Sequence, residues 1–188
     1  MEKSKNTIEN YIMNCADSVK KTDFEILANI ADMIFKSKNK NRIFTAGNGG
    51  SASTASHIVN DLVKGCRVGD NTGFDAMCLS DSSTVVTCLG NDFAYEDVYK
   101  IQLETFAKAN DLLIVFSGSG NSPNIIKGCE TAKKIGMKVI AFGGRDGGKM
   151  KNIADICLVA PTNSMEMLED MHLMYEHALV VAIKELLS

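Results

Sequence analysis

The chain has few of the residues that mark special protein classes. It contains no tryptophan, two prolines and three histidines among 188 residues. No apolar run approaches the roughly 18 residues that a membrane-spanning helix needs. The start, MEKSKNTIENYIMNCADS, also lacks the apolar core of a signal peptide. We therefore expect a cytoplasmic protein with no membrane partner.

Neither sign of charge dominates the sequence. Charged residues make up 23 % and the formal net charge is −3. A nucleic-acid partner would favour a basic face, for which the composition gives no support. We expect the partners to be small molecules or other subunits. The length suits one domain over residues 1–188, with residues 1–40 as a helical extension of the same unit.

The cysteines form no recognisable framework. There are six of them, without any CxxC pair and mostly among apolar neighbours. Disulfide scaffolds and structural zinc sites both favour closely spaced pairs, so we interpret these residues as reduced core thiols. A metal, if bound, is then held by histidine and carboxylate. The residues concerned are Cys15, Cys66, Cys78, Cys88, Cys129 and Cys157.

Apolar periodicity predicts an α/β fold. The first 40 residues read as two helices, the second capped by Thr22 or Asp23. The last segment, 165–187, is apolar almost all round, which predicts a helix buried in this chain or against another subunit. Between them, helical stretches separate most of five short apolar strands, an alternation typical of a parallel sheet covered on both faces. The predicted strands are 42–45, 75–79, 111–116, 138–142 and 154–159.

Two loops follow predicted strands and precede predicted helices. The first is glycine-rich, and glycines let a backbone approach an anion at a helix start. Taken alone, such a turn is equally often only a tight connection. The second loop has three serines in six residues and is followed by Pro123, which suits a first helical turn. Hydroxyls and amides at a strand's carboxyl end predict phosphate binding. The predicted contacts are Asn48, Gly49, Gly50 and Ser51 in the first loop, and Ser117, Gly118, Ser119 and Ser122 in the second.

Nucleotide motifs are absent from both loops. GNGGSA and SGSGNS lack the GxGxxG spacing and the lysine of GxxxxGK[ST], which argues against NAD and ATP.

Several segments together resemble a known family. AGNGGSASTASH, CLGNDF, SGSGNSPN, GGRDGGKM and LEDMHLMYEH, in this order, are similar to the sugar isomerase (SIS) domain family and to its phosphoheptose isomerases. The resemblance implies a flavodoxin-like αβα sandwich and a homotetramer with active sites at subunit interfaces. It implies isomerisation of sedoheptulose 7-phosphate to D-glycero-D-manno-heptose 7-phosphate through an enediol, for lipopolysaccharide or capsule heptose. Such enzymes commonly hold zinc with two histidines and polar side chains from two helices.

His57 and Asp61 stand four residues apart after the first loop. This spacing places both on one face of a helix, where they form either an ordinary surface pair or half of a catalytic site. The nearby phosphate loop favours the site. The resembling enzymes have a histidine and a glutamate here, with the glutamate also acting as base. Asp61 is one methylene shorter, which puts its reach to the substrate in question but leaves metal ligation easy.

The last predicted helix supplies the other half of the site. Its polar residues are Glu169, Asp170, His172, Glu176 and His177. Spacing alone favours Glu169 with His172, whereas the family motif favours Glu169 with His177 and leaves His172 in reserve. The predicted metal ligands are then His57, Asp61, Glu169 and His177, with Asp61 or Glu169 as base and His177 as acid.

Glu169 stands where the resembling enzymes have glutamine. The extra negative charge favours a divalent cation, or else marks a changed substrate.

The GND segment is a further candidate. Asn91 and Asp92 fall where the resembling enzymes contact substrate, although a turn between helices explains them equally well. Residues 145–147 are interpreted as a tight loop without chemistry.

Three functions compete at this point. The first is the isomerase. The second is a non-catalytic SIS protein that senses phosphosugars or binds the replication-initiation protein DnaA. The third is an isomerase of another phosphosugar, suggested by Asp61 and Glu169. A pure binder needs the phosphate loops but not the acids and imidazoles, so their presence favours an enzyme.

Overall fold

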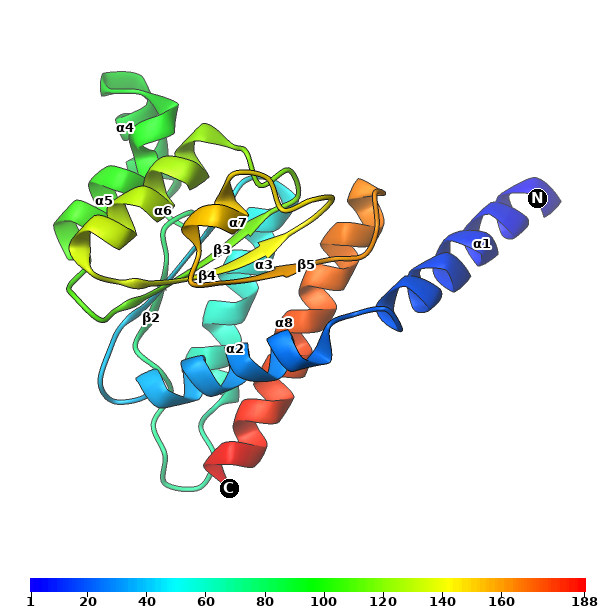
Figure 1. Cartoon of the computed structure of the whole chain (residues 1–188), viewed down its shortest axis with the longest axis horizontal. Helices are drawn as coiled ribbons and strands as arrows, with labels where there is room; N and C mark the ends of the chain where they lie inside the picture. The colour runs from blue at the N-terminus through cyan, green and yellow to red at the C-terminus, as the bar shows by residue number, and fades with distance from the viewer.

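Five parallel strands form the centre of the computed structural model, which describes residues 1–188 (Figure 1). Their order is β2-β1-β3-β4-β5. Each boundary lies within two residues of the predicted strand, and the α/β class is confirmed. The strands are β1 (Ile43–Gly47), β2 (Ala76–Cys78), β3 (Leu112–Ser117), β4 (Lys138–Gly143) and β5 (Ile156–Val159).

Helices cover both faces of the sheet. Side chains alternate across a strand, so Ile43 packs with α2, α3 and α8 while Phe44 packs with α5, α6 and α7. The three layers form the expected αβα sandwich. The helices are α1 (Glu2–Val19), α2 (Phe24–Ser37), α3 (Gly50–Asn60), α4 (Ser83–Asp92), α5 (Val98–Phe106), α6 (Pro123–Ile135), α7 (Met150–Ile153) and α8 (Met165–Leu187), with a π turn η1 (Asp61–Gly65) and a 3-10 turn η2 (Tyr95–Asp97).

The helix ends follow from local sequence. The Asp23 carboxylate accepts a hydrogen bond of 3.0 Å from the Ile26 amide and caps α2, as one of the two predicted alternatives. Pro123 occupies the first turn of α6, as predicted. Gly136 ends α6 in the left-handed conformation, with φ of 93°.

Two helices bury none of their side chains in this chain. The first, α1, projects from the body and meets it near the start of α8, where the Tyr11 hydroxyl donates to the Asp170 carboxylate (Figure 1). The second, α4, stands beyond the carboxyl end of the sheet. The long helix α8 does bury one stripe, as predicted, but leaves Met174 and Val181 exposed on another.

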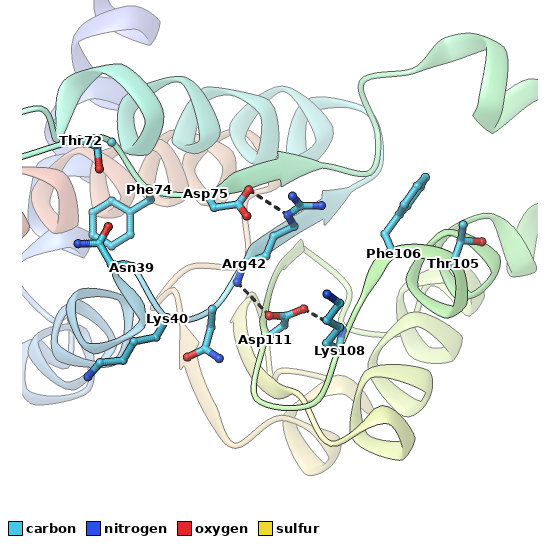
Figure 2. Close-up of a pocket in the computed structure, with 12 residues that line it drawn as sticks. Asn39, Lys40, Arg42, Thr72, Phe74, Asp75, Thr105, Phe106, Lys108 and Asp111 are labelled. Atoms are coloured by element: carbon cyan, nitrogen blue, oxygen red, sulfur yellow. Dashed lines mark hydrogen bonds and ion pairs between the residues drawn. The ribbon is translucent and has the colours of Figure 1, made fainter.

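A polar hollow of about 700 Å³ lies at the amino end of the sheet (Figure 2). The buried Asp111 carboxylate accepts backbone hydrogen bonds from Arg42 and Lys108, and the Arg42 guanidinium pairs with Asp75 at 2.9 Å. These bonds join the loops that precede β1, β2 and β3. Open parallel sheets bind ligands at the opposite end, so we assign this hollow a structural role.

All six cysteines are free thiols. Three of them, Cys66, Cys78 and Cys129, are buried, whereas Cys88 is exposed, so the expected core location holds only in part. None of the helices combines the length and the apolarity needed to cross a membrane.

Candidate functional site

The strand order brings the two predicted phosphate loops together. β1 pairs with β3 in parallel, and Gly47 at the end of one strand lies opposite Phe116 near the end of the other. From β1 the chain crosses to β2 on one side, and from β2 it crosses back past β1 to β3 on the other side, so the topology switches between β1 and β3. Ligands of open α/β sheets bind at such a point, outside the carboxyl ends of the strands.

The first loop turns sharply from β1 into α3. A side chain at Gly47 would place its Cβ 2.3 Å from the Ser51 carbonyl oxygen, so this close approach needs glycine. Gly49 has a φ of 56° and caps α3 without a side-chain bond. The amino end of α3 therefore has no side-chain cap of its own, and its backbone N–H groups attract an anionic group.

The second loop is held by hydrogen bonds within the loop and by one from the segment 144–149. The Ser117 hydroxyl accepts from the Gly120 amide, and the Ser119 hydroxyl accepts from the Asn121 amide, both at 3.2 Å. The Asn121 side-chain oxygen accepts from the Lys149 amide at 3.1 Å. Residues 144–149 thus support the second loop, and this is a structural role for the segment that was expected to have no chemistry.

A side-chain network connects the two loops. The Asn48 amide group donates to Asn124 at 2.9 Å and accepts from it at 2.8 Å. The Tyr95 hydroxyl donates to the same Asn48 oxygen at 3.1 Å. Tyr99 joins from α5, where burial raises the pKa of its phenol to about 12. Asn124 is fully buried, so its two bonds fix the first loop against the start of α6.

The loops enclose a small pocket of about 150 Å³. It holds six of the eight predicted loop contacts, the exceptions being Gly49 and Gly50. Hydroxyls and the starts of α3 and α6 converge there, an arrangement suited to a phosphate group. The lining residues are Asn48, Ser51, Phe116, Ser117, Gly118, Ser119, Ser122, Met165 and Glu169.

A second group of polar side chains forms where α3 ends beside α8. One ligand atom from each of His57, Asp61, Glu176 and His177 lies within 4.8 Å of the others. The two imidazole rings meet edge to face, with centroids 4.9 Å apart. Asp61 begins the π turn η1, a feature frequent at functional sites. The structure thus brings three of the four predicted metal ligands together and adds Glu176.

Glu176 is the unusual member of this cluster. Its side chain is 0 % exposed, and neither carboxylate oxygen has a hydrogen-bond partner. The Nε2 atom of the His177 imidazole lies 3.4 Å from one of these oxygens. Burial, and after it the Asp61 carboxylate, raise the pKa of Glu176 to about 8. An orphaned buried carboxylate between two imidazoles and a second carboxylate fits a bound divalent cation.

Glu169 does not join this cluster within the chain. It precedes His177 by eight residues on α8, a separation of roughly 12 Å along the helix axis. Its carboxylate instead lies against Gly50, at the start of α3, and lines the loop pocket.

His172, the reserve histidine, is buried away from the cluster. Its Nε2 lies 3.1 Å from the Gly143 carbonyl oxygen, and its ring packs near Phe116 and Phe142. Burial lowers its pKa to about 4. The neutral imidazole is part of the core.

Asn91 and Asp92 lie on the exposed last turn of α4. The Asn91 amide donates to the Asp92 carboxylate at 2.8 Å, and the Cys88 thiol donates to the same carboxylate at 3.4 Å. Neither residue lines the loop pocket of this chain. Their contact with substrate stays a prediction.

Sequence reasoning gave no role to Glu176 or Asn124. A signal for Glu176 was present, because it follows His172 by four residues and precedes Leu179 by three, on the stripe that α8 buries. A glutamate on the buried face of a helix needs a hydrogen-bond partner or a bound cation. Asn124 had no comparable signal, since its partner lies 76 residues earlier.

A family model, curated relatives and solved structures all indicate the same family for this chain. Residues 9–144 match the SIS domain family. A phosphoheptose isomerase of Helicobacter pylori strain HPAG1 is 38 % identical over 147 residues, covering 78 % of this chain and 76 % of the relative. One from Akkermansia muciniphila is 35 % identical over 175 residues, covering 90 % and 91 %. The solved phosphoheptose isomerase of Neisseria gonorrhoeae superposes with a TM-score of 0.89 at 26 % identity, over 96 % of this chain and 98 % of that one.

Proposed function

Because the chain belongs to the SIS domain family, and within it to the phosphoheptose isomerases, we propose that it converts sedoheptulose 7-phosphate to D-glycero-D-manno-heptose 7-phosphate. The reaction moves a carbonyl group between two neighbouring carbons through an enediol. It needs a base, an acid and a means of stabilising negative charge on the enediolate oxygens. The product class suits the synthesis of bacterial surface heptose, as the family resemblance implies.

The observation that carries this proposal is the cluster of His57, Asp61, Glu176 and His177 beside a phosphate pocket. A protein that only binds phosphosugars needs the pocket alone. Burying a carboxylate without any hydrogen bond is costly and brings nothing to such a protein. The cluster therefore favours chemistry over a purely regulatory role.

The spacing along α3 suits a phosphorylated sugar chain. Ser51 lines the phosphate pocket and His57 belongs to the cluster, six residues or roughly 9 Å further along the helix. An open seven-carbon phosphosugar has a comparable reach. With its phosphate in the serine loop, its first two carbons lie beside the cluster.

We assign the roles within the cluster from the solvent exposure of each side chain. Glu176 is inaccessible to substrate, whereas His177 has a side chain that is 50 % exposed and Asp61 is partly buried. Asp61 is then the base that removes the proton from carbon 1, and His177 the acid that supplies a proton towards carbon 2. Glu176, buried 3.4 Å from Nε2 of His177, is left as a metal ligand.

The same four side chains form a set that suits zinc, which favours imidazole and carboxylate ligands. When bound by His57, Asp61, Glu176 and His177, such a cation supplies positive charge near the developing enediolate oxygens.

The proposal includes assembly into a homo-oligomer, a tetramer by resemblance. Exposed apolar side chains on α1, with Ile8 60 % and Ile12 58 % exposed, have no partner in the chain. His177 lies between exposed Met174 and Val181 on α8, so the apolar stripe runs directly past the cluster. A second copy that covers this stripe also borders the active site.

We place the enzyme in the cytoplasm. Six free thiols are usual in a reducing compartment and uncommon in an oxidising one.

The test is turnover of sedoheptulose 7-phosphate by the zinc-loaded protein in D₂O. We expect the aldose to appear with solvent deuterium on carbon 2. If the protein binds the phosphosugar but neither forms the aldose nor exchanges deuterium, the isomerase proposal is wrong. That result would favour a non-catalytic, regulatory function. The same assay on other ketose phosphates tests the alternative substrate that Asp61 and Glu169 suggest.

A further inference from the structure

One asparagine of this chain is followed directly by glycine. Asn48 precedes Gly49 in the first loop, and none of the other asparagines has a glycine after it. Glycine has no Cβ to hinder its backbone nitrogen, which makes Asn-Gly the dipeptide most open to deamidation. In this reaction the nitrogen of the second residue attacks the side-chain amide carbon of the first.

The Gly49 nitrogen is available for such an attack. Gly49 is exposed to solvent, and its N–H group donates no hydrogen bond within the chain. The residue caps α3, so its N–H group lies outside the hydrogen-bond ladder of the helix. Water and hydroxide therefore reach this group and can take up its proton.

The side-chain amide of Asn48 is held by three other side chains. Its Nδ2 donates to the Asn124 oxygen at 2.9 Å, and its Oδ1 accepts from the Asn124 amide at 2.8 Å, from Tyr95 at 3.1 Å and from Tyr99 at 3.3 Å. Asn124 is only 1 % exposed, so its two bonds are shielded from water. Attack by the Gly49 nitrogen makes the planar amide carbon tetrahedral and displaces both of its polar atoms. Each of these bonds therefore opposes the reaction.

We propose that Asn48–Gly49 is a latent deamidation site, and that the bonds from Asn124 and Tyr95 control the rate of the reaction. The deprotonated Gly49 nitrogen forms a bond to Cγ of Asn48, the bond from Cγ to Nδ2 breaks, and a five-membered succinimide ring results. The proton from Gly49 passes through water to the departing ammonia. Water then opens the ring at either carbonyl carbon and gives aspartate or isoaspartate. In total one water is consumed and one ammonia is released, with no change of oxidation state.

Deamidation places a new negative charge in the loop pocket, because Asn48 is one of its lining residues. A carboxylate repels a phosphate group and cannot donate a hydrogen bond to Asn124. The isoaspartate product also lengthens the backbone by one carbon and so displaces the loop. The modified protein should therefore lose affinity for a phosphosugar, and this consequence alone rests on the proposed function.

Peptide mass spectrometry measures the reaction directly. The folded protein is incubated at 37 °C and pH 8, and deamidation of each asparagine is followed by a gain of about 1 Da. We expect Asn48 to react at least about tenfold more slowly in the wild type than in a synthetic peptide of residues 44–53, and about tenfold faster in Asn124→Ser than in the wild type. Tyr95→Phe, which removes one hydroxyl from an exposed side chain, should increase the rate about threefold.

Two controls identify the cause of a change in rate. Asn163 is exposed and followed by serine, so it is an internal reference whose rate should be equal in all the proteins. Tyr11→Phe removes a hydroxyl from α1, outside the loops, and should leave Asn48 at the wild-type rate. Wild-type rates at Asn48 in folded Asn124→Ser and Tyr95→Phe would overturn the proposal. So would a wild-type rate equal to that of the peptide, a comparison that needs neither variant to fold.

The variant Asn48→Asp contains one of the two products directly. Calorimetry should show that it binds sedoheptulose 7-phosphate at least about tenfold more weakly than the wild type does. Equal affinities would contradict the expected loss of affinity. A wild type that binds no phosphosugar refutes the proposed function and leaves the deamidation site standing, since its rates are measured by mass alone.

Discussion

Asn48 and Asn124 exchange two hydrogen bonds, of 2.9 and 2.8 Å, between the two loops that follow β1 and β3. Each amide group both donates and accepts, and the Asn124 oxygen accepts a further bond from the Ile125 amide at 3.0 Å. Few side chains other than asparagine satisfy this geometry, because the pair needs a donor and an acceptor on each partner. The pair therefore ties the two loops to each other, with the loop pocket between them.

Replacing Asn124 should loosen this unit. In Asn124→Asp, a carboxylate oxygen faces the Asn48 oxygen and the bond of 2.8 Å is lost. We expect KM for the phosphosugar to rise about tenfold, with kcat changed less than threefold, because the groups that transfer protons lie elsewhere. Steady-state kinetics provide the measurement. Asn152→Asp, an exposed change on α7, is the control. An unchanged KM in folded Asn124→Asp would show that the Asn48–Asn124 pair does not contribute to substrate binding.

The layout of the fold followed from periodicity alone. Each of the five strands has a short apolar run bounded by polar residues or glycine, and α8 begins and ends where its pattern does. The order of the strands did not follow from periodicity, because β1 pairs with residues on both β2 and β3, and no local pattern specifies this choice. The π turn at Asp61 likewise has no sequence signature.

The site was predictable only where its residues are close in sequence or match a known motif. His57 and Asp61 are one helical turn apart, so their shared face was evident, and the family motif selected His177. Glu169 was joined to them by the motif, although the helix geometry of one chain separates it from His177. Glu176 was overlooked because an adjacent glutamate and histidine normally point in different directions on a helix, whereas here both reach the same cluster.

Glu176 should matter for metal binding more than Glu169 does. In Glu176→Gln a neutral amide replaces the fully buried carboxylate, which removes a negative charge from the ligand set. We expect the zinc affinity, measured by competition with a chromophoric chelator, to fall at least tenfold.

Glu169→Gln is the control for this experiment, since Glu169 lies in the loop pocket. Its zinc affinity should remain within about threefold of the wild type. If Glu169→Gln loses zinc while Glu176→Gln keeps it, the ligand set predicted from the sequence is right, with Glu169 supplied by another subunit, and the set drawn from this chain is wrong.

Assembly should depend on the exposed stripe of α1. Neither Ile8 nor Ile12 is buried in the chain, so the double variant Ile8→Asp/Ile12→Asp should fold and still fail to assemble. Light scattering after size exclusion measures the mass of the particle, and circular dichroism checks the fold. Asn6→Asp/Asn10→Asp adds the same charge to the opposite face of α1 and should assemble normally. An intact oligomer in the isoleucine variant would show that α1 takes no part in the interface.

His172 should make the stability of the protein depend on pH. A carbonyl oxygen only accepts, so Nε2 donates to Gly143, and Nδ1 is left bare and without a partner inside the core. Burial lowers the pKa from its ordinary value of 6.5 to about 4. Between these values the unfolded chain binds the proton more readily than the folded one, so acid favours unfolding.

The contribution of His172 is therefore fully present above pH 6.5 and is lost as the pH falls towards 4. Its upper bound is about 3 kcal/mol, from the size of the shift. His172→Gln keeps a donor for Gly143 and cannot titrate in this range. We expect the difference in urea unfolding free energy between wild type and His172→Gln to change by about 2 kcal/mol between pH 7 and 4.5, with a chelator present throughout. Parallel curves for the two proteins would show that the imidazole takes up a proton equally well when folded, and that its place in the core is not the one described.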